Sequence, residues 1–235
     1  MLRLFVDAAL VAGRIVDLPA GPARHVQVRR LQPGEALVLF DGRGGEWRAR
    51  VHAIGRQAVQ VEPMAHEAAE RELVPAVTLI VGMPANERMD WLVEKATELG
   101  AAALQPATCE RSVLRLEGER AARRRAHWQA LAVAAAEQCG RTRVPQVHAV
   151  RDLGEILPSC APDARRWLLS PVAQAAPQRP TDKGPLIVLS GPEGGLAPAE
   201  EAAARAAGFE AVGLGPRVLR AETAPLALLA WLGLP

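Results

Sequence analysis

The chain has 235 residues, of which 49% are hydrophobic and 23% are charged, and its formal net charge is +2. This length is enough for one large domain or for two small ones. No apolar run is long enough to span a membrane, so we expect no membrane partner. The N-terminus lacks a signal-peptide pattern, which predicts a cytoplasmic protein.

The cysteines and histidines give no framework for a metal or for disulfides. Cys109, Cys139 and Cys160 are odd in number and lack ligand spacing, and no histidine pairs with them at the spacing of a zinc site. We therefore expect reduced thiols and no metal.

The positive charge is concentrated in two stretches. Residues 1–61 hold nine arginines and five acids, and residues 111–151 hold nine arginines and three acids. Arginine contacts phosphate in a bidentate way and stacks on bases, so the pattern is compatible with nucleic-acid binding. A genome rich in G and C, which encodes many arginines and alanines, would explain the same composition.

The first part of the chain predicts a small β-domain. Short strands with glycine turns and few helices are typical of a small barrel. The expected elements are apolar runs at 2–6 and 10–16, a short basic helix at 23–31, and strands at 36–40, 46–51 and 58–61. Residues 62–72 are acidic and rich in alanine, which predicts a linker and a domain boundary after residue 72.

The second part predicts an α/β domain with a parallel sheet, because its strands are continuous apolar runs. The expected strands lie at 76–82, 104–106, 147–150, 166–170, 186–190 and 209–213. The expected helices are 87–99 with Asn86 as its N-cap, 119–139, and a final helix at 225–232 that begins at Pro225. Residues 171–185, rich in Pro, Ala and Gln, read as a loose connection.

Two of these strands run into Gly-Pro turns. The first turn is Ser190-Gly191-Pro192-Glu193-Gly194-Gly195-Leu196, and the second begins Leu214-Gly215-Pro216-Arg217-Val218-Leu219-Arg220. Ligands bind beyond the carboxyl ends of the strands in an open parallel sheet, so we expect one pocket walled largely by backbone. The chain has no Ser-His-Asp set, no phosphate-binding Walker loop and no dinucleotide-binding glycine pattern.

The two turns resemble the signature motifs of the SPOUT methyltransferases, the α/β-knot class that binds S-adenosylmethionine. More narrowly, Gly191–Leu196 and Leu214–Ala224 are similar to the bacterial family that methylates N3 of one uridine in 16S ribosomal RNA. The resemblance covers nearly the whole chain. It also rests on Phe40–Gly42, Arg88–Gly100, Thr108–Val113 with Cys109 at the family's serine position, and Glu137–Pro145. Ala85 stands where the family usually has a lysine.

This resemblance implies an architecture. Residues 73–235 would form an α/β-knot domain, with a parallel sheet and a deep trefoil knot, and residues 1–72 a PUA-like RNA-binding β-barrel. It also implies a homodimer whose partner is the 16S ribosomal RNA of the small subunit.

The resemblance and the positions of the turns together predict three groups of site residues. S-adenosylmethionine would contact Leu169, Leu189, Gly191, Pro192, Glu193, Gly194, Gly195, Leu214, Gly215, Val218, Leu219, Thr223 and Ala224. Arg220 and Glu222 would be catalytic, and the proton acceptor would be Glu222, Glu193 or neither of them. RNA would contact Arg24, Arg29, Arg30, Arg111, Arg141, Arg143 and Arg217.

Two other functions are open at this stage. The protein would be a SPOUT methyltransferase that acts on another RNA, such as tRNA, or a non-catalytic RNA-binding factor in ribosome assembly. Binding of S-adenosylmethionine separates the last of these from the two enzymes.

Overall fold

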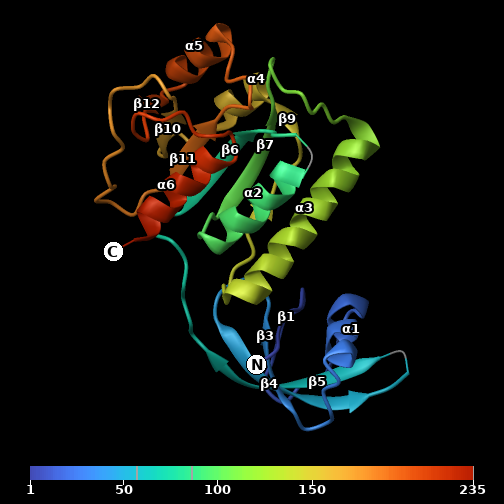
Figure 1. Ribbon diagram of the computed structural model, residues 1–235. Helices are drawn as coiled ribbons and strands as arrows, with labels where there is room; N and C mark the ends of the chain where they lie inside the picture. The colour runs from blue at the N-terminus through green and yellow to red at the C-terminus, as the bar shows by residue number, and fades with distance from the viewer. Residues whose placement is uncertain (57, 86, 235) are drawn as a thin grey trace. The chain divides into compact units, whose positions relative to one another are not determined.

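The computed structural model describes residues 1–56, 58–85 and 87–234 (Figure 1). The predicted helix cap Asn86 lies outside the described residues. No helix in the described part of the chain is both long and apolar enough to cross a membrane. The described residues also contain no group of three or more His, Cys, Asp or Glu side chains that could hold a metal ion.

The chain divides into two compact units. Unit 1 comprises Met1–Glu72 together with Ala136–Val144, and unit 2 comprises Leu73–Ala135 and Pro145–Pro235. Helix α3 (Gly118–Cys139) therefore contributes its last turn to unit 1 and the rest of its length to unit 2.

Unit 1 is a small β-domain with one complete helix. Its elements are β1 (Arg3–Phe5), β2 (Val16–Asp17), α1 (Ala20–Val28), β3 (Ala36–Phe40), β4 (Glu46–Ile54) and β5 (Val59–Glu67). The strands lie in the order β1-β3-β4-β5-β2, with β1 parallel to β3 and the other pairs antiparallel. Since β1 and β2 are the two edges, the curled sheet is a half-barrel.

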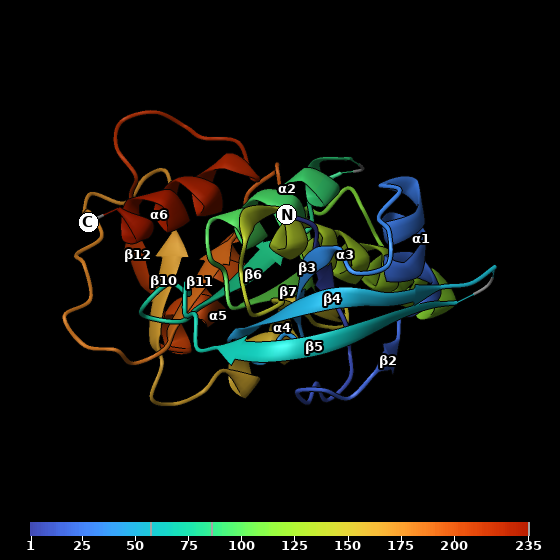
Figure 2. The same cartoon turned by 90° about the horizontal axis from the view of Figure 1, so that it is seen from below.

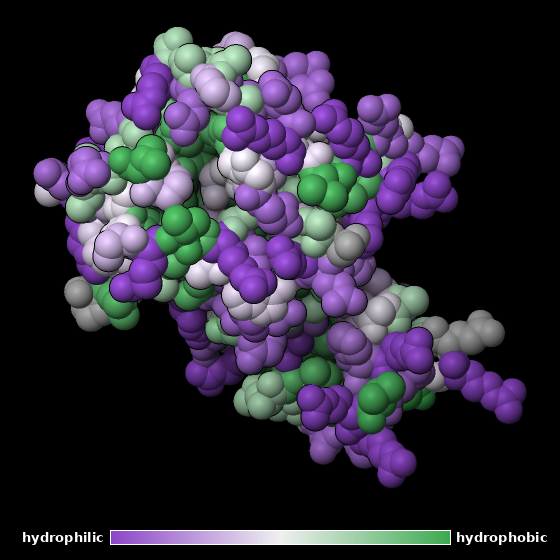
Figure 3. Space-filling view, turned by 45° about the horizontal axis from the view of Figure 1, so that its top comes forward, coloured by the Kyte–Doolittle hydropathy of each residue, from purple (hydrophilic) through white to green (hydrophobic). Residues whose placement is uncertain are grey.

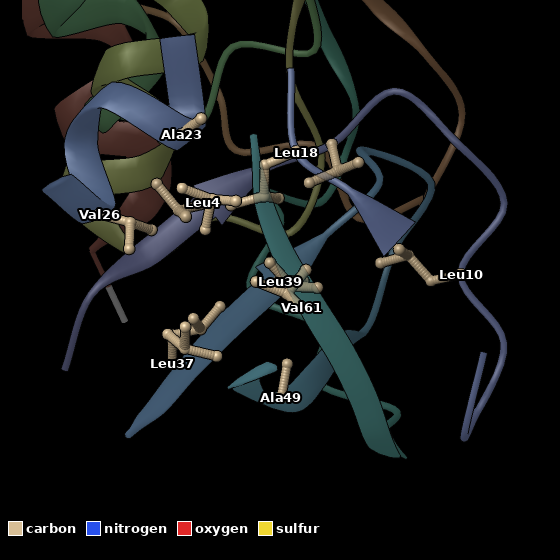
Figure 4. Packing of buried hydrophobic residues seen from close by; sticks show 12 residues of the cluster. Leu4, Leu10, Leu18, Ala23, Val26, Leu37, Leu39, Ala49 and Val61 are labelled. Atoms are coloured by element: carbon tan, nitrogen blue, oxygen red, sulfur yellow. The ribbon is translucent and has the colours of Figure 1, made fainter. Parts of the chain in front are cut away.

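The core of unit 1 lies between α1 and the sheet (Figure 4). Ala23 and Val26 are one helical turn apart and are the buried residues of α1. They pack in one cluster with Leu4 of β1 and with Leu37 and Leu39 of β3. The two β3 leucines are two residues apart and so lie on one face of the strand. The buried leucines of β3 thus join the buried residues of α1 in the core.

Strand β5 is longer than the sequence predicted. It runs to Glu67, so the prediction of a linker from residue 62 is wrong for its first part. Pro63, which indicated a break, lies opposite Ala49 where the register of β4 and β5 shifts. Proline is tolerated at such a bulge because the ladder of hydrogen bonds is already interrupted there.

Buried polar contacts hold the end of α3 in unit 1. Glu137 Oε1 accepts a hydrogen bond from Phe5 N at 2.9 Å, and burial raises the pKa of this carboxyl. The guanidinium of Arg3 donates to the Arg141 carbonyl at 2.9 Å. Arg141 itself pairs with Glu72, and only 4% of its side chain is exposed. These contacts explain why the residues after α3 belong to the β-domain.

Unit 2 is a parallel α/β domain, as predicted. Its strands are β6 (Val77–Gly82), β7 (Ala103–Thr108), β8 (Gln146–Val147), β9 (Arg151–Asp152), β10 (Arg165–Leu169), β11 (Leu186–Ser190) and β12 (Glu210–Val212). Its other helices are α2 (Glu87–Glu98), α4 (Leu153–Ile156), η1 (Leu157–Ser159), α5 (Pro198–Ala206) and α6 (Thr223–Gly233). Every strand pair is parallel, and the order is β12-β10-β11-β6-β7-β8, with β9 beside β7.

Helices cover both faces of the unit 2 sheet. Figure 2 shows α2 and α6 on one side of the strands and α4 and α5 on the other. On the second side, Leu168 and Leu189 pack in one cluster with Leu153 of α4 and with Phe209. Coverage on both faces accounts for the continuous apolar character of these strands.

The connection between β10 and β11 is anchored, in contrast to the loose segment that its composition predicted. The carbonyl of Ala175 accepts a hydrogen bond from Gly213 N at 2.8 Å. The Arg179 guanidinium donates to the carbonyls of Trp231 and Leu234, at 2.6 Å each, and lies 5.3 Å from the centre of the Trp231 ring. The connection thus contacts both the segment that precedes α6 and the end of α6.

Helix α6 begins two residues before the predicted start. Thr223 is its first residue, and the amides of Thr223 and Ala224 both donate to the Arg220 carbonyl. Pro225 remains within the first turn, where amide groups have no partner inside the helix, so its missing N–H costs no hydrogen bond.

Candidate functional site

The carboxyl ends of β10, β11 and β12 meet around one cavity of about 600 Å³. This volume is in the range of small-molecule sites in proteins. Its walls come from four places: residues 168–172, the first turn, residues 212–221, and single residues of α2, α5 and α6. In the space-filling view, apolar side chains interrupt the hydrophilic surface (Figure 3). The position agrees with the expectation that ligands bind beyond the strand ends.

The first turn, residues 190–196, supplies one wall, and it includes Gly191, Pro192, Glu193, Gly194 and Gly195. It is closed by a hydrogen bond from Gly195 N to the Pro192 carbonyl at 2.8 Å. It also lies directly against the end of β6, where a Cβ added at Gly82 would meet Pro192 at 2.5 Å. The close approach of these two backbones therefore requires glycine at position 82.

The first turn is also held by side chains from neighbouring loops. Arg111 Nη1 donates to the carbonyls of Gly194 and Leu196 at 3.2 and 3.3 Å. Glu193 Oε1 accepts from Ala85 N at 3.0 Å and from Arg88 Nη1 at 3.4 Å. These bonds hold the middle and the second half of the turn against the neighbouring segments.

The second turn, which we define as residues 214–222, supplies the opposite wall. Leu214, Gly215, Val218 and Leu219 line the cavity, and Ala224 follows from the start of α6. Gly215 has a φ of +99°, a conformation that other residues adopt only with strain. Residues 215–218 are exposed, and Val218 is 81% exposed although it is apolar. Residues 193–195 of the first turn are exposed as well, so the two walls differ in the hydrogen bonds that hold them rather than in exposure.

Two of the residues predicted to contact the cofactor have a different position from the one expected. Leu189 is fully buried in the cluster under α4 and α5 and does not line the cavity. Thr223 does not line it either, because it is the first residue of α6. Leu169, in contrast, lines the cavity as predicted. Strand alternation explains Leu189, because a residue at a strand end faces one side of the sheet only.

The two predicted catalytic residues are in different environments. Arg220 is exposed and lines the cavity. Glu222 is 6% exposed and is not part of the cavity wall. Its Oε1 lies 3.9 Å from Arg88 Nε, and its Oε2 has no hydrogen-bond partner among the described residues. Arg220 is therefore placed to meet a substrate, whereas Glu222 is behind the wall.

Several residues of the site were not predicted. Arg88 lines the cavity and contacts both Glu193 and Glu222. Ser170, Pro171 and Val172 form the wall after β10. The rule that predicted the two turns would also have found these three, because they directly follow the end of a parallel strand.

The loop that carries Arg111 supports the same wall from behind. Cys109 N donates to Ser112 Oγ at 3.0 Å, and Glu110 N donates to Glu200 Oε1 at 2.8 Å. Burial raises the pKa of the Cys109 thiol to about 12, so this cysteine is not a reactive thiolate. The family motif in this loop thus has a structural role here.

The arginines predicted to contact RNA also differ in exposure. Arg24, Arg29 and Arg30 are exposed on and just after α1, and Arg217 lines the cavity. Arg143 is about half exposed and contacts Glu70 at 3.3 Å. Arg141 is buried against Glu72, so its guanidinium does not form the surface contact that was predicted. Burial in an ion pair is its role in the structure.

Comparison with known proteins defines the class. Residues 71–233 match the family described as an RNA methyltransferase domain, and residues 23–64 match the family described as an RNA methyltransferase PUA domain. The chain is therefore a methyltransferase with an N-terminal PUA domain.

Relatives along the whole chain define the family. Ribosomal RNA small subunit methyltransferase E of Bacillus subtilis is 31% identical over 98% of this chain and 95% of its own length. The protein of that name from Synechocystis is 33% identical over 97% of this chain and 76% of its own length. This chain belongs to the ribosomal RNA small subunit methyltransferase E family.

Solved structures give the same result. The family member from Neisseria gonorrhoeae, bound to S-adenosyl methionine, is 35% identical with a TM-score of 0.92, over 98% of this chain and 96% of that chain. A methyltransferase from Legionella pneumophila, in complex with the same cofactor, is 28% identical with a TM-score of 0.91, over the same shares of the two chains. The fold class inferred from the sequence, an α/β-knot methyltransferase with a PUA-like domain, is confirmed.

Proposed function

We propose that this protein transfers a methyl group from S-adenosylmethionine to N3 of a specific uridine in the 16S ribosomal RNA of the small subunit. The observation that supports this proposal most strongly is the cavity between the two turns, in a chain that is similar along nearly its whole length to a cofactor-bound family member. The chain contains both an RNA methyltransferase domain and an RNA methyltransferase PUA domain.

The residues around the cavity fit S-adenosylmethionine. The apolar walls, from Leu169 and Val172 on one side and Leu214 and Leu219 on the other, suit the adenine ring. The backbone of Gly191 and its neighbours leaves polar groups free to read the edge of that ring. The charged groups, Glu193 and the arginines, suit the methionine part. The bound cofactor supplies a sulfonium-activated methyl group for in-line transfer.

We assign the chemical step to Arg220 rather than to an acid. Uracil N3 is a weakly acidic imide, and a guanidinium beside the base would favour its deprotonated form. Arg220 is exposed in the cavity wall, so it can reach a base that enters from solvent. We assign neither acid as the proton acceptor, because Glu222 is buried outside the cavity wall and Glu193 is bonded to Ala85 and Arg88; the N3 proton leaves to solvent water before the methyl group is transferred.

RNA binding is the proposed role of the N-terminal domain, residues 1–72, and of the arginines near the cavity. Arg24, Arg29 and Arg30 form an exposed basic cluster in the domain that includes the PUA match. Arg143 and Arg217 are further exposed cations, and Arg111 adds positive charge beside the first turn. Their contacts with phosphate would make binding strongly dependent on salt.

We also propose a homodimer that works in the cytoplasm, where its ribosomal substrate is found. Helix α6 is apolar on almost every side, and the exposed apolar residues of unit 2 include Val74, Trp91 and Leu234. A second copy of the chain that covers these residues would remove them from water. Sedimentation of the purified protein tests this point.

The experiment that tests the function is methylation in vitro, mapped by mass spectrometry. The purified protein and labelled S-adenosylmethionine are incubated separately with small subunits, protein-free 16S RNA and tRNA from a strain that lacks the enzyme. We expect one N3-methyluridine in 16S RNA. Methylation of tRNA alone would favour the other SPOUT activity, and absence of cofactor binding would favour a non-catalytic assembly factor.

A further inference from the structure

Arg88 is a charged residue of the cavity that neither turn contains. It lies in the first turn of α2, its side chain is 46% exposed, and it lines the cavity. Its Nη1 is 3.4 Å from Glu193 Oε1, and its Nε is 3.9 Å from Glu222 Oε1. One guanidinium thus contacts an acid from the first turn and an acid from the end of the second turn.

The contact with Glu222 matters because that carboxylate is buried. Its side chain is 8% exposed, and its Oε2 has no hydrogen-bond partner among the described residues. A buried carboxylate without a counterion is strongly unfavourable, and the neighbouring segment moves or the group is neutralised if the partner is lost. Glu222 directly precedes α6, so a shift of Glu222 moves the backbone of the second turn.

The contact with Glu193 ties the same guanidinium to the first turn. Glu193 Oε1 is shared between Arg88 and the amide of Ala85, which fixes the carboxylate against the start of α2. Arginine can serve two carboxylates because its planar fork carries five donors, whereas a lysine ammonium is a point charge.

We propose that Arg88 is a positioning residue that couples the two turns and sets the distance between them. This inference rests on the proposed function, because the two turns are the walls of the S-adenosylmethionine site. Arg88 holds the Glu222 carboxylate in place, and thereby holds the second turn at the spacing that the cofactor requires. Because the cofactor would contact both walls, an error in this spacing removes contacts and lowers cofactor affinity.

The test is a double-mutant cycle read as calorimetric affinity for S-adenosylmethionine, with the full chain. Arg88→Ala should weaken binding about tenfold, since the pair is partly exposed. Glu222→Gln alone should weaken it less. In the Arg88→Ala background, however, Glu222→Gln should restore affinity, because it removes the uncompensated charge. Arg88→Lys should restore little.

Matched measurements separate this role from others. Arg123→Ala, which removes an exposed arginine paired with Glu119 on α3, should leave cofactor affinity unchanged. At saturating cofactor, Arg88→Ala should recover most of the single-turnover rate, whereas loss of a catalytic residue would leave it low. If Arg88→Ala does not fold, the double variant, which carries no unpaired charge, is compared with Glu222→Gln.

Two results would overturn the coupling role: wild-type affinity in Arg88→Ala, or additive losses in the double variant. The failure of the proposed function has a different signature. In that case the wild-type protein itself would not bind S-adenosylmethionine, and no comparison of variants would be needed.

Discussion

The two turns of the site both carry a Gly-Pro pair near a strand end, but they differ in the contacts that hold them in place. The first turn is closed by its own hydrogen bond and held by Arg111, by Glu193 and by its contact with Gly82. Residues 215–218 of the second turn are exposed, and the carbonyls of Arg220 and Ala221, near the end of this turn, accept hydrogen bonds. The first turn therefore has more hydrogen bonds to its surroundings among the described residues, and we expect the second turn to be the more mobile wall.

This difference suggests that the two turns contribute to cofactor binding in different ways. A turn that is already ordered by hydrogen bonds, such as the first turn, can bind the cofactor at little cost in conformational entropy. An exposed wall can close over the cofactor and present Arg220 to the RNA. The five predictions that follow test this contrast, from the largest expected effect to the smallest.

Arg220→Ala should abolish most of the activity and leave the cofactor site intact. Loss of a donor that stabilises developing negative charge costs roughly a hundred- to thousandfold in rate. Single-turnover methylation at saturating RNA measures the rate, and calorimetry should give near wild-type affinity for the cofactor. Arg220→Lys should recover little. Wild-type turnover in Arg220→Ala would exclude the catalytic role.

Gly82→Ala should displace the first turn. The added Cβ would lie 2.5 Å from both the nitrogen and Cδ of Pro192, and backbone at that distance must move. A displacement of about 1 Å in such a site costs on the order of a hundredfold in the reaction, and we expect a loss of that order in kcat/KM. A folded Gly82→Ala protein with unchanged cofactor affinity would show that the first turn tolerates displacement.

Arg111→Ala should loosen the same wall without a steric clash. It removes hydrogen bonds from a charged donor to the carbonyls of Gly194 and Leu196, but the arginine is exposed. We expect cofactor affinity to fall about threefold to tenfold, a loss reduced by solvent screening. RNA affinity, measured at several salt concentrations, distinguishes this from a phosphate contact, whose loss flattens the salt dependence.

Gly215→Ala changes the second turn and should lower cofactor affinity less than Gly82→Ala does. A Cβ at position 215 meets no atom within 4 Å, so the cost is the strain of a φ of +99°. Strain of this kind costs on the order of 1–3 kcal/mol, and an exposed turn can relax part of it. We expect a few-fold weaker cofactor binding and an unchanged melting temperature. A loss as large as that of Gly82→Ala would contradict the contrast between the turns.

The smallest expected effect is a difference in amide hydrogen exchange between the two turns of the wild-type protein. Amide hydrogens of residues 215–219 should exchange with solvent faster than those of residues 193–196 when no ligand is present. Addition of S-adenosylmethionine should slow exchange mainly in the second turn. Equal exchange in the two turns without cofactor is the outcome that would remove the distinction between them.

Much of the fold could be predicted because local patterns decide it. Ala49 and Val51 alternate with arginines, which is the period of two of a half-exposed strand, and Ile187 to Leu189 show the continuous apolar run of a strand covered on both sides. Pro63 and the acids after it misled the prediction, since only the pairing of β5 with β4 decides that residues 62–67 are a strand.

In the site, too, the sequence predicted features formed by neighbouring residues but not contacts between distant segments. The sequence by itself determined the two turns, because glycine and proline at strand ends act on their own backbone. Only the tertiary structure decided that Leu189 and Glu222 are buried away from the cavity, that Arg141 pairs with Glu72, and that Arg88 reaches both turns. Ion pairs and burial depend on segments far apart in the chain, and no local pattern records which segments meet.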